Sequence, residues 1–370
     1  MRIGIHAPLD ERRTGVAVYA RTLGQLLARR AEVRWNPSEP CDVELYHLGN
    51  NALHRQAYEK AIERPGLVVL HDAVLNHFFL STQDQQHYVA EFVYNYGAWF
   101  EDFARRLWRE RARAAEDFRY FEYPMLRRVV ERAKGVIVHN PAAARAASAH
   151  GARCVTEIPH LLLPTPAVPV AVREQLRRQL ACSGRGVLFG VFGFLRETKR
   201  LVRVLEVFRR LESSLPEARL LVAGRFVSEE LARACEPYFR MRNVIRVGFL
   251  SERELSLYVA AIDVGINLRW PTAGETSGMT IRLMSSGKAV VVSDTLENAR
   301  WPEDCVVRIP TGVEESDALE FVIRWLTRFP EDAQEIGRRA ARYVASVHGA
   351  EHCAEGYWDA IQVAVTTVSR

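Results

Sequence analysis

The amino-acid sequence predicts an α/β fold made of two doubly wound parallel-sheet domains. The chain has 370 residues, which is enough for two hydrophobic cores of similar size. Short apolar runs alternate with amphipathic helical segments in both halves, as expected when helices join parallel strands. A proline-rich segment at 159–169 separates the two sets and disfavours regular hydrogen bonding. We therefore expect domains at residues 1–165 and 166–350.

The N-terminal half combines buried strands with a helical insertion. Residues 16–30 have the spacing of an amphipathic helix. The stretch 74–132 is rich in aromatic residues and arginine and has helical spacing, so we predict two or more inserted helices. Most of its aromatic side chains are expected to pack; the alternatives are a wall of an acceptor pocket or a surface that rests on a membrane. The predicted strands are 2–6, 44–48, 66–70 and 135–139.

The C-terminal half repeats the pattern. We predict strands at 186–192, 218–223, 244–247, 263–268 and 289–293, and helices at 201–211, 252–261 and 279–286.

Composition restricts the class of protein. Hydrophobic residues make up 48% and charged residues 26%, as in ordinary globular proteins, and no apolar run is long enough to span a bilayer. The net charge of +5 suits anionic partners, although a bias towards arginine explains much of it. Six scattered cysteines without a C-x-x-C pair indicate reduced thiols and no clustered metal site. We expect a cytoplasmic protein, with peripheral contact to the inner membrane face as an alternative.

The strongest motif runs from a buried strand through a Pro/Gly loop into a helix, at 267–288. Thr276, Ser277 and Gly278 form a compact turn before Met279, and the free N–H groups of a helix start favour an anion such as a diphosphate. Glu275 would then point a carboxylate at the group attached to the phosphate, where it can accept hydrogen bonds from sugar hydroxyls. The alternative is an ordinary N-cap that needs no ligand.

A second motif follows the first strand of the C-terminal half. Gly193 lies in a turn, and three cations, Arg196, Lys199 and Arg200, precede the next helix. Ligands of open parallel sheets bind at the carboxyl ends of the strands, so we predict phosphate binding here. The alternative is a solvated basic face.

Histidines provide a weaker signal. His71 and Asp72 directly follow a buried strand, where the imidazole could bond a sugar hydroxyl; the alternative is a packed histidine beside a capping aspartate. His150 and His160 lack metal-ligand spacing and are expected to be ordinary surface or loop residues.

Together the two C-terminal motifs resemble the GT-B glycosyltransferases of the large retaining group called family 4, in a G-E-T-S-G variant. Lys199 matches the lysine that holds the donor phosphates in that family, and Glu275 matches its first acidic residue. Phe194 occupies the position of the family arginine, so Arg196 or Arg200 could substitute. The second acidic position, which holds the ribose in the family, is Arg282 here.

The resemblance implies two Rossmann-like domains that face each other across a cleft, with a final helix, residues 351–370, that crosses back to the N-terminal domain. It implies retaining transfer of a hexose-type sugar from a UDP- or GDP-sugar to a glycan, lipid-linked or small-molecule acceptor, without a metal or other cofactor. Lys199, Glu275 and His71 would be the catalytic residues. Gly15 would let the donor or the acceptor approach the backbone.

Two other functions fit the same architecture. A nucleotide-sugar epimerase would convert the donor alone, and a catalytically silent GT-B subunit would act as a scaffold. The absence of G-x-G-x-x-G and P-loop motifs disfavours NAD and P-loop chemistry. Nucleic acid is not expected as a partner, because no basic stripe with interleaved aromatic residues is present on a recognisable module.

Overall fold

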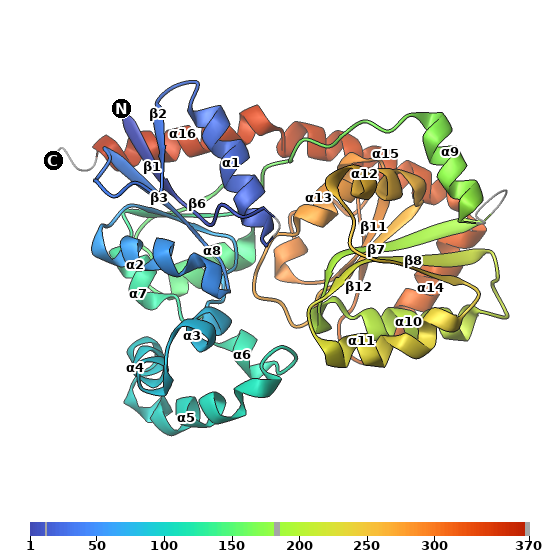
Figure 1. Cartoon of the computed structure of the whole chain (residues 1–370), viewed down its shortest axis with the longest axis horizontal. Coiled ribbons are helices and arrows are strands. Elements are labelled where there is room, and N and C mark those ends of the chain that lie inside the picture. The colour runs from blue at the N-terminus through green and yellow to red at the C-terminus, as the bar shows by residue number, and fades with distance from the viewer. Residues whose placement is uncertain (12, 181–185, 367–370) are drawn as a thin grey trace. The chain divides into compact units, whose positions relative to one another are not determined.

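The computed structural model describes residues 1–11, 13–180 and 186–366, and the chain forms two compact units (Figure 1). Unit 1 consists of Met1–Leu163, Pro271–Gly278 and Val347–Arg370, and unit 2 of Pro164–Trp270 and Met279–Ser346. Each unit is built on a six-stranded parallel sheet with flanking helices. The predicted α/β fold with two parallel sheets is therefore confirmed.

The sheet of unit 1 has the strand order β2-β1-β3-β4-β5-β6. Its four inner strands are those predicted from apolar runs. The edge strands β2 and β6 were missed because they are short and mostly half-buried, so neither contains a continuous apolar run. The strands are β1 (Arg2–His6), β2 (Glu32–Trp35), β3 (Val43–Leu48), β4 (Leu67–Leu70), β5 (Gly135–Val138) and β6 (Val155–Glu157).

Helices cover both faces of this sheet. Alternate side chains of β4 point to opposite faces: Leu67 and Val69 pack with α1 and α16, whereas Val68 and Leu70 pack with α2, α7 and α8. The α-helices are α1 (Gly15–Leu27), α2 (Arg55–Glu63), α3 (Asn76–Thr82), α4 (Gln85–Tyr96), α5 (Glu101–Glu110), α6 (Arg119–Glu122), α7 (Arg127–Arg132), α8 (Pro141–Ala149) and α16 (Ala350–Thr366), with short 3₁₀ turns at Ala52–His54, Ala98–Phe100 and Arg111–Arg113.

Helices α3 to α7 account for the aromatic-rich stretch; α3 to α6 lie together in Figure 1, and α7 lies beside α2. Phe78, Phe79, Tyr88 and Phe92 are buried in one hydrophobic core with the sheet and α2. The packing interpretation thus holds for most of these aromatic residues. Trp99 differs, because its side chain is 99% exposed.

The sheet of unit 2 has the strand order β12-β11-β10-β7-β8-β9. Its longest pair, β7 and β8, is in parallel register over nine residues, and Gly193 lies opposite Gly224. The short edge strand β12 was not predicted. The strands are β7 (Val187–Leu195), β8 (Ala218–Phe226), β9 (Val244–Val247), β10 (Val264–Asn267), β11 (Ala289–Ser293) and β12 (Val307–Ile309).

The helices of unit 2 cover both faces of its sheet (Figure 1). Helices α10 and α14 bury apolar side chains against β7 and β8 in one core. The predicted helices 201–211 and 252–261 are confirmed as α10 and α12, and the third begins one residue earlier than predicted. The helices are α9 (Val170–Gln179), α10 (Leu201–Leu211), α11 (Glu229–Cys235), α12 (Glu252–Ala261), α13 (Gly278–Ser285), α14 (Glu315–Arg328) and α15 (Pro330–Val347), with 3₁₀ turns at Glu197–Lys199, Glu236–Arg240 and Leu296–Asn298.

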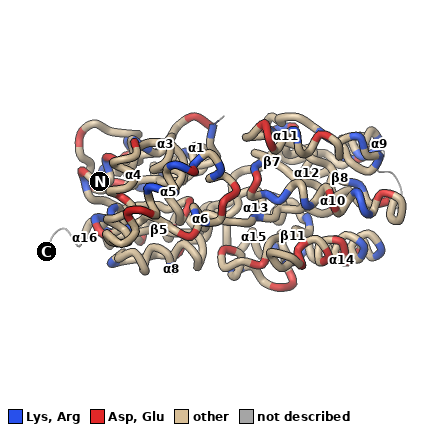
Figure 2. The backbone as a smooth tube through the Cα atoms, turned by 90° about the horizontal axis from the view of Figure 1, so that it is seen from below, with Lys and Arg blue, Asp and Glu red and all other residues tan. Residues whose placement is uncertain are grey.

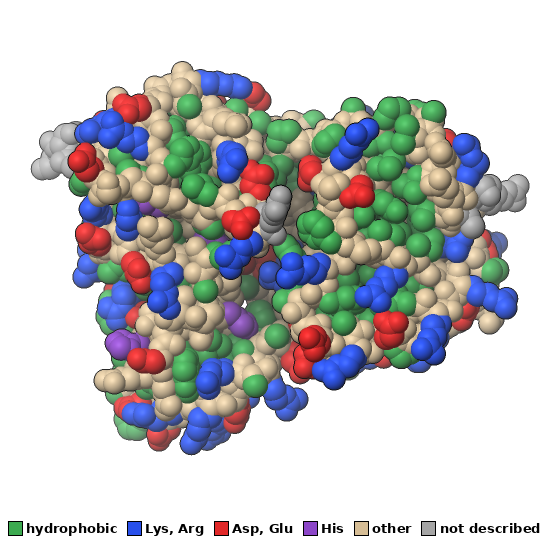
Figure 3. All heavy atoms as spheres, viewed as in Figure 1, with side chains coloured by type: hydrophobic (Ala, Val, Ile, Leu, Met, Phe, Trp, Pro, Cys, Tyr) green, Lys and Arg blue, Asp and Glu red, His purple; other side chains and the backbone are tan. Residues whose placement is uncertain are grey.

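Charges are mixed along the chain. Lys and Arg alternate with Asp and Glu over the backbone and on the face in view (Figures 2 and 3). Five cysteines in the described ranges are free thiols, and Cys182 lies outside those ranges. Within the described residues, no helix combines the length and the apolar character that a membrane crossing requires.

Candidate functional site

The carboxyl edge of the unit 1 sheet is lined with imidazoles. His6 ends β1, His47 lies near the end of β3, and His71 and His139 directly follow β4 and β5. Because parallel strands end at the same edge, these four side chains gather there. All four are buried. This edge is where an open parallel sheet binds its ligand.

The loop Pro271–Gly278 docks on the same edge of unit 1. The backbone N–H of Ala73, just after β4, donates to the carbonyl of Ala273 at 2.7 Å. Gly274 has φ of +75°, and a Cβ there would lie 2.6 Å from the Cβ of Ala73. A glycine is therefore required both for the backbone conformation and for this close approach.

Asn140 fixes the loop at a second point. Its Oδ1 accepts from the N–H of Ala143 at 2.9 Å and so caps α8. Its Nδ2 donates to the carbonyl of Gly274 and to Oγ1 of Thr276, both at 2.9 Å. The Thr276 hydroxyl in turn donates to the carbonyl of His139 at 3.2 Å. Asn140 thus stabilises both the start of α8 and the loop Pro271–Gly278.

Glu275 has a fixed orientation within this loop. Its Oε2 accepts from the N–H of Ala273 at 2.9 Å and from the hydroxyl of Thr272 at 3.2 Å. The side chain is half-buried. Ser277, which follows, is buried, and Gly278 is exposed and opens α13. The predicted residues Glu275, Thr276, Ser277 and Gly278 therefore share one ordered loop.

His71 lies within a cluster of rings. Its Nε2 is 2.9 Å from Nδ1 of His47, and their rings are stacked with centroids 5.2 Å apart. The edge of Tyr19 approaches the ring of His71 with centroids at 4.9 Å. Asp72, its neighbour in sequence, accepts from the backbone N–H of Asn50 at 2.7 Å. The packed-histidine alternative is therefore partly right: His71 is buried, with 9% of its surface exposed.

Burial keeps these imidazoles neutral. It lowers the pKa of His47 to about 3, and neighbouring imidazoles lower it further. Burial also lowers the pKa of His54 and of His139 to about 4, although a backbone hydrogen bond partly opposes the effect for each. The pKa of His71 is lowered well below its usual value by burial and then by the imidazoles around it. His47, His71 and His139 therefore offer neutral donors and acceptors at ordinary pH.

The expectation for His160, a surface or loop residue, was right only in part. It is a loop residue, but it is buried, with its ring 4.7 Å from that of Tyr19 and 5.4 Å from that of His139. Its backbone carbonyl accepts from Nδ1 of His348 at 2.7 Å. The proline-flanked sequence suggested an exposed linker, whereas residues brought from other parts of unit 1 bury the ring.

The corresponding edge of unit 2 carries cations. Gly193 has φ of +95°, and a Cβ there would lie 3.4 Å from Nζ of Lys199. Lys199 is buried and donates to the carbonyl of Phe192. The N–H of Trp270, after β10, donates to the carbonyl of Thr198 at 2.8 Å. Lysine and glycine thus meet near the carboxyl end of β7, but Gly193 lies inside the strand, opposite Gly224, and not in the predicted turn, because β7 continues to Leu195.

The two arginines beside Lys199 differ from each other. Arg196 is exposed, with its guanidinium 6.0 Å from the ring of Phe194. Arg200 has φ of +59° and pairs with Glu315, whose carboxylate is 1% exposed, at 2.6 Å. The Arg200 guanidinium therefore neutralises a buried carboxylate, whereas Arg196 faces solvent.

Three further positions are less distinctive. Gly15 opens α1, and a Cβ there would meet nothing within 4 Å, so the fold itself does not require glycine. Met279 is the half-buried second residue of α13. Arg282, on the same helix, pairs with Glu252 at the start of α12.

The structure gathers the predicted residues into two groups. Unit 1 holds His71 and the loop from Glu275 to Gly278, and unit 2 holds Gly193, Lys199 and the two arginines. Sequence reasoning missed His47, His139 and Asn140. A polar residue directly after a buried strand, the signal that identified His71, also follows the predicted strand 135–139 and could have identified Asn140. No group of three His, Cys, Asp or Glu side chains placed to bind a metal occurs among the described residues.

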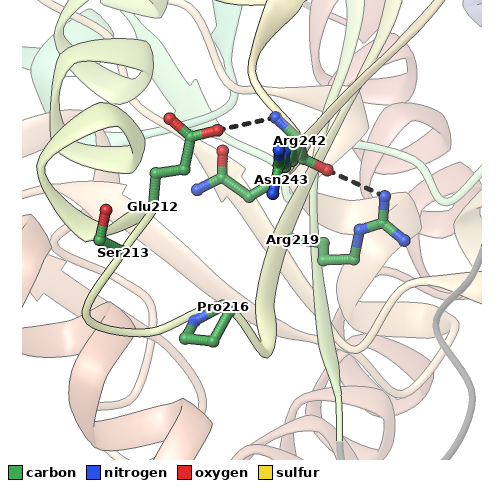
Figure 4. A pocket seen from close by; sticks show the side chains of 6 residues that line it. All are labelled: Glu212, Ser213, Pro216, Arg219, Arg242 and Asn243. Carbon is green, nitrogen blue, oxygen red and sulfur yellow. Dashed lines mark hydrogen bonds between the residues drawn. The ribbon is translucent and has the colours of Figure 1, made fainter.

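Unit 2 has a surface hollow outside the carboxyl edge of its sheet (Figure 4). It is lined by Glu212, Ser213, Pro216, Arg219, Arg242 and Asn243. Arg219 begins β8 and Asn243 precedes β9, so the hollow lies at the amino ends of the strands. The backbone N–H of Arg242 donates to Oε1 of Glu212 at 2.8 Å, and Nη2 of Arg219 donates to the carbonyl of Arg242 at 3.1 Å. The hollow is therefore distinct from the candidate site.

Solved structures share this fold. A sucrose-phosphate synthase from Thermosynechococcus elongatus superposes with a TM-score of 0.67 at 14% identity, covering 99% of this chain and 100% of that one. Anabaena HepE in complex with UDP-glucose gives 0.63 at 14% identity, covering 100% and 99%. WaaG, a glycosyltransferase involved in lipopolysaccharide biosynthesis, gives 0.61 at 15% identity, covering 98% and 99%. The chain thus has the GT-B fold of these proteins. No protein-family model and no curated protein sequence matches it.

Proposed function

We propose that this protein is a glycosyltransferase that moves a hexose-type sugar from a UDP- or GDP-sugar to an acceptor hydroxyl, with retention of configuration, in glycan or glycolipid synthesis. The observation that carries the proposal is the docking of the loop Pro271–Gly278 on the carboxyl edge of the unit 1 sheet. Through the hydrogen bond between Ala73 and Ala273, the chain around Glu275 lies against the chain around His71. The fold shared with glycosyltransferases, one of them in complex with UDP-glucose, supports the same activity here.

The sugar is assigned to the groups of unit 1. Glu275 is a carboxylate on an ordered loop, and a carboxylate can accept two hydroxyl hydrogen bonds. His71 is a neutral imidazole on the neighbouring strand end. Neutral imidazoles and one carboxylate suit an uncharged polyol better than they suit a phosphate.

The diphosphate is assigned to two features of the chain, the start of α13 and the turn after β7. The first is the start of α13 at Gly278 and Met279, where unbonded N–H groups favour an anion. The second is the turn after β7, where Lys199 and the exposed Arg196 supply positive charge. Arg200 has a smaller part in this assignment, because its guanidinium pairs with Glu315.

The proposed reaction proceeds on one face of the sugar. The acceptor oxygen bonds to the anomeric carbon as the bond from that carbon to the phosphate oxygen breaks, and the acceptor proton passes to a leaving-phosphate oxygen. The products are the glycosylated acceptor and the nucleoside diphosphate. Lys199 and the α13 N–H groups stabilise the charge that develops on the phosphate. No protein nucleophile, metal or other cofactor is required by this proposal.

The proposed acceptor is a glycan, a lipid-linked sugar or a small-molecule hydroxyl. For a lipid-linked acceptor the chain offers Trp99, which is fully exposed, and Tyr94, beneath the guanidinium of Arg128 at 4.0 Å. Tryptophan together with basic residues suits the interface of an anionic membrane. We propose peripheral membrane contact through this surface.

A transfer assay tests the activity. The protein is incubated with UDP-glucose or GDP-mannose and a panel of sugar and lipid-linked acceptors, and mass spectrometry detects an acceptor that has gained a hexose. NMR of the product then reports the anomeric configuration. Glu275→Gln should lower the rate about 10- to 100-fold, since it removes a charge-assisted hydrogen bond. Glu230→Gln on the exposed face of α11 is the matched control and should behave as wild type.

Two outcomes would replace the proposal. Conversion of the sugar nucleotide without any acceptor would identify an epimerase. A folded protein that binds no nucleotide would favour the silent scaffold, and co-purification would then identify its partner.

A further inference from the structure

The contact between His47 and His71 carries more information than burial alone. Nδ1 of His47 and Nε2 of His71 are 2.9 Å apart, so exactly one proton lies between these two nitrogens when both rings are neutral. The stacked rings, tilted by 22°, fix their mutual orientation. Which ring donates decides which nitrogen of His71 carries its proton.

The surroundings of His47 settle the direction of this hydrogen bond. His47 is fully buried, and its other nitrogen, Nε2, is sealed from solvent without a partner. If the proton of His47 were on Nε2, a buried N–H group would lack an acceptor, which is costly. With the proton on Nδ1, only a lone pair is left there, and the proton is used in the hydrogen bond to His71.

The position of the proton on His71 then follows. Because Nε2 of His71 accepts from His47, the proton of the neutral His71 ring must be on Nδ1. Nδ1 of His71 is neither hydrogen-bonded within the described chain nor sealed from solvent. It is therefore the nitrogen available to a ligand.

We propose that His47 is a positioning residue that holds His71 as a neutral Nδ1–H hydrogen-bond donor. In this form His71 donates to an oxygen acceptor of the ligand and does not act as a base at the site. That the acceptor is a hydroxyl oxygen of the donor sugar rests on the proposed function. The tautomer itself does not depend on it.

NMR of the full-length protein labelled with ¹⁵N-histidine tests the tautomer directly, because the nitrogen shifts distinguish Nδ1–H from Nε2–H rings. The resonance of His71 is assigned from its loss in His71→Gln. We expect the Nδ1–H pattern in wild type. His47→Asp replaces the donor by an acceptor at about the same place, so it should move the proton of His71 from Nδ1 to Nε2. An Nε2–H pattern in wild type would overturn the proposal.

A second variant separates positioning from packing. His47→Asn supplies an amide N–H close to the original Nδ1 and should keep His71 in the Nδ1–H form. If His47 only filled space, Asp would leave the Nδ1–H pattern of His71 unchanged, which would also overturn the proposal. Urea unfolding of each variant confirms that the fold is retained.

Ligand binding links the tautomer to the proposed function. With UDP-glucose as probe, His47→Asp should weaken binding about fivefold to tenfold, the effect of one hydrogen bond, while the affinity for UDP stays within twofold. His47→Asn should restore the affinity for UDP-glucose. Equal losses for UDP and UDP-glucose would assign His47 a purely structural role. Failure of wild type to bind either nucleotide would contradict the proposed function and leave the NMR result as the test of the tautomer.

Discussion

The carboxyl edges of the two sheets differ in their chemistry. Every one of the 11 histidines lies in unit 1, and none lies in unit 2. The unit 1 edge holds the buried neutral imidazoles of His47, His71 and His139, a contact between His6 and the buried carboxylate of Glu44, and the carboxylate of Glu275 on the docked loop. The unit 2 edge holds Lys199 and two arginines.

Under the proposed function, this difference assigns the sugar to the edge of unit 1 and the phosphate to the edge of unit 2. Neutral rings in a dry edge give directional hydrogen bonds without attracting phosphate, so they suit an uncharged sugar. Cations in the turn after β7 attract an anion but distinguish little between sugars.

The largest expected effect is a loss of stability at acid pH that is confined to unit 1. The pKa values of His47, His54 and His139 lie at about 3, 4 and 4 in the fold and near 6.5 when unfolded. Above pH 6.5 both states are neutral, and below it only the unfolded chain binds the protons. Stability should therefore fall as the pH drops from 6.5 towards 4. Each histidine contributes about 1.4 kcal/mol per pH unit, so the three together contribute about 4 kcal/mol per pH unit.

Urea unfolding at pH 7.5 and 5.5 measures this loss. Hydrogen exchange followed by peptide should place it in unit 1, because unit 2 has no histidine. Equal destabilisation of both units would contradict the comparison.

The next prediction tests whether Arg200 stabilises the buried Glu315 or binds phosphate. Replacing it in Arg200→Met leaves the carboxylate of Glu315 buried without its partner, which should cost about 3 kcal/mol of unfolding free energy. The double variant Arg200→Met with Glu315→Leu should recover most of that loss. Its affinity for UDP, measured by calorimetry, should stay within twofold of wild type. A tenfold weaker affinity in the stable double variant would return Arg200 to the phosphate site.

Removing the lysine tests the cationic edge. Lys199→Met keeps the aliphatic stem and removes the charge, so transfer should fall about 100-fold, as for loss of one group that stabilises developing charge. Initial rates measure the effect, with the exposed Lys134→Met as the matched control. A loss of less than threefold would show that the charge of Lys199 has no part in transfer.

A smaller effect concerns the docking of the loop on unit 1. Asn140→Asp keeps the oxygen that caps α8 and removes the two donors to Gly274 and Thr276. We expect a loss of about 1–2 kcal/mol in stability and faster hydrogen exchange in 271–278, with α8 still protected. Unchanged exchange in the loop would mean that Asn140 does not hold it.

The smallest effect concerns the exposed aromatic surface. Trp99→Ala should change stability by less than about 0.5 kcal/mol, because the side chain packs against little. Sedimentation with vesicles of anionic lipid should show severalfold weaker binding. Trp35→Ala would be a poor control, because the Trp35 ring packs closely on Gly24: a Cβ added at Gly24 would lie 2.5 Å from that ring. The exposed Phe321→Ala in unit 2 serves instead, and an equal loss in both variants would contradict a specific membrane contact.

The sequence predicted the fold well because buried parallel strands are continuous apolar runs. It missed β2, β6 and β12, which are short edge strands without such runs. It also predicted that Glu275, Lys199 and His71 lie at strand ends. It could not predict that Asn140 bonds a loop more than 130 residues away, since that contact depends on tertiary packing. For the same reason the burial of His160 and its contact with Tyr19 were not predictable from local composition.

The most direct test of the division between the two edges compares UDP with UDP-glucose by calorimetry. Glu275→Gln should weaken the binding of UDP-glucose about tenfold and leave UDP unchanged, because Glu275 is assigned to the sugar. Lys199→Met should weaken both ligands by the same factor, because Lys199 is assigned to the diphosphate. If Glu275→Gln weakened UDP as much as UDP-glucose, or Lys199→Met spared UDP, the assignment of sugar to unit 1 and diphosphate to unit 2 would be wrong.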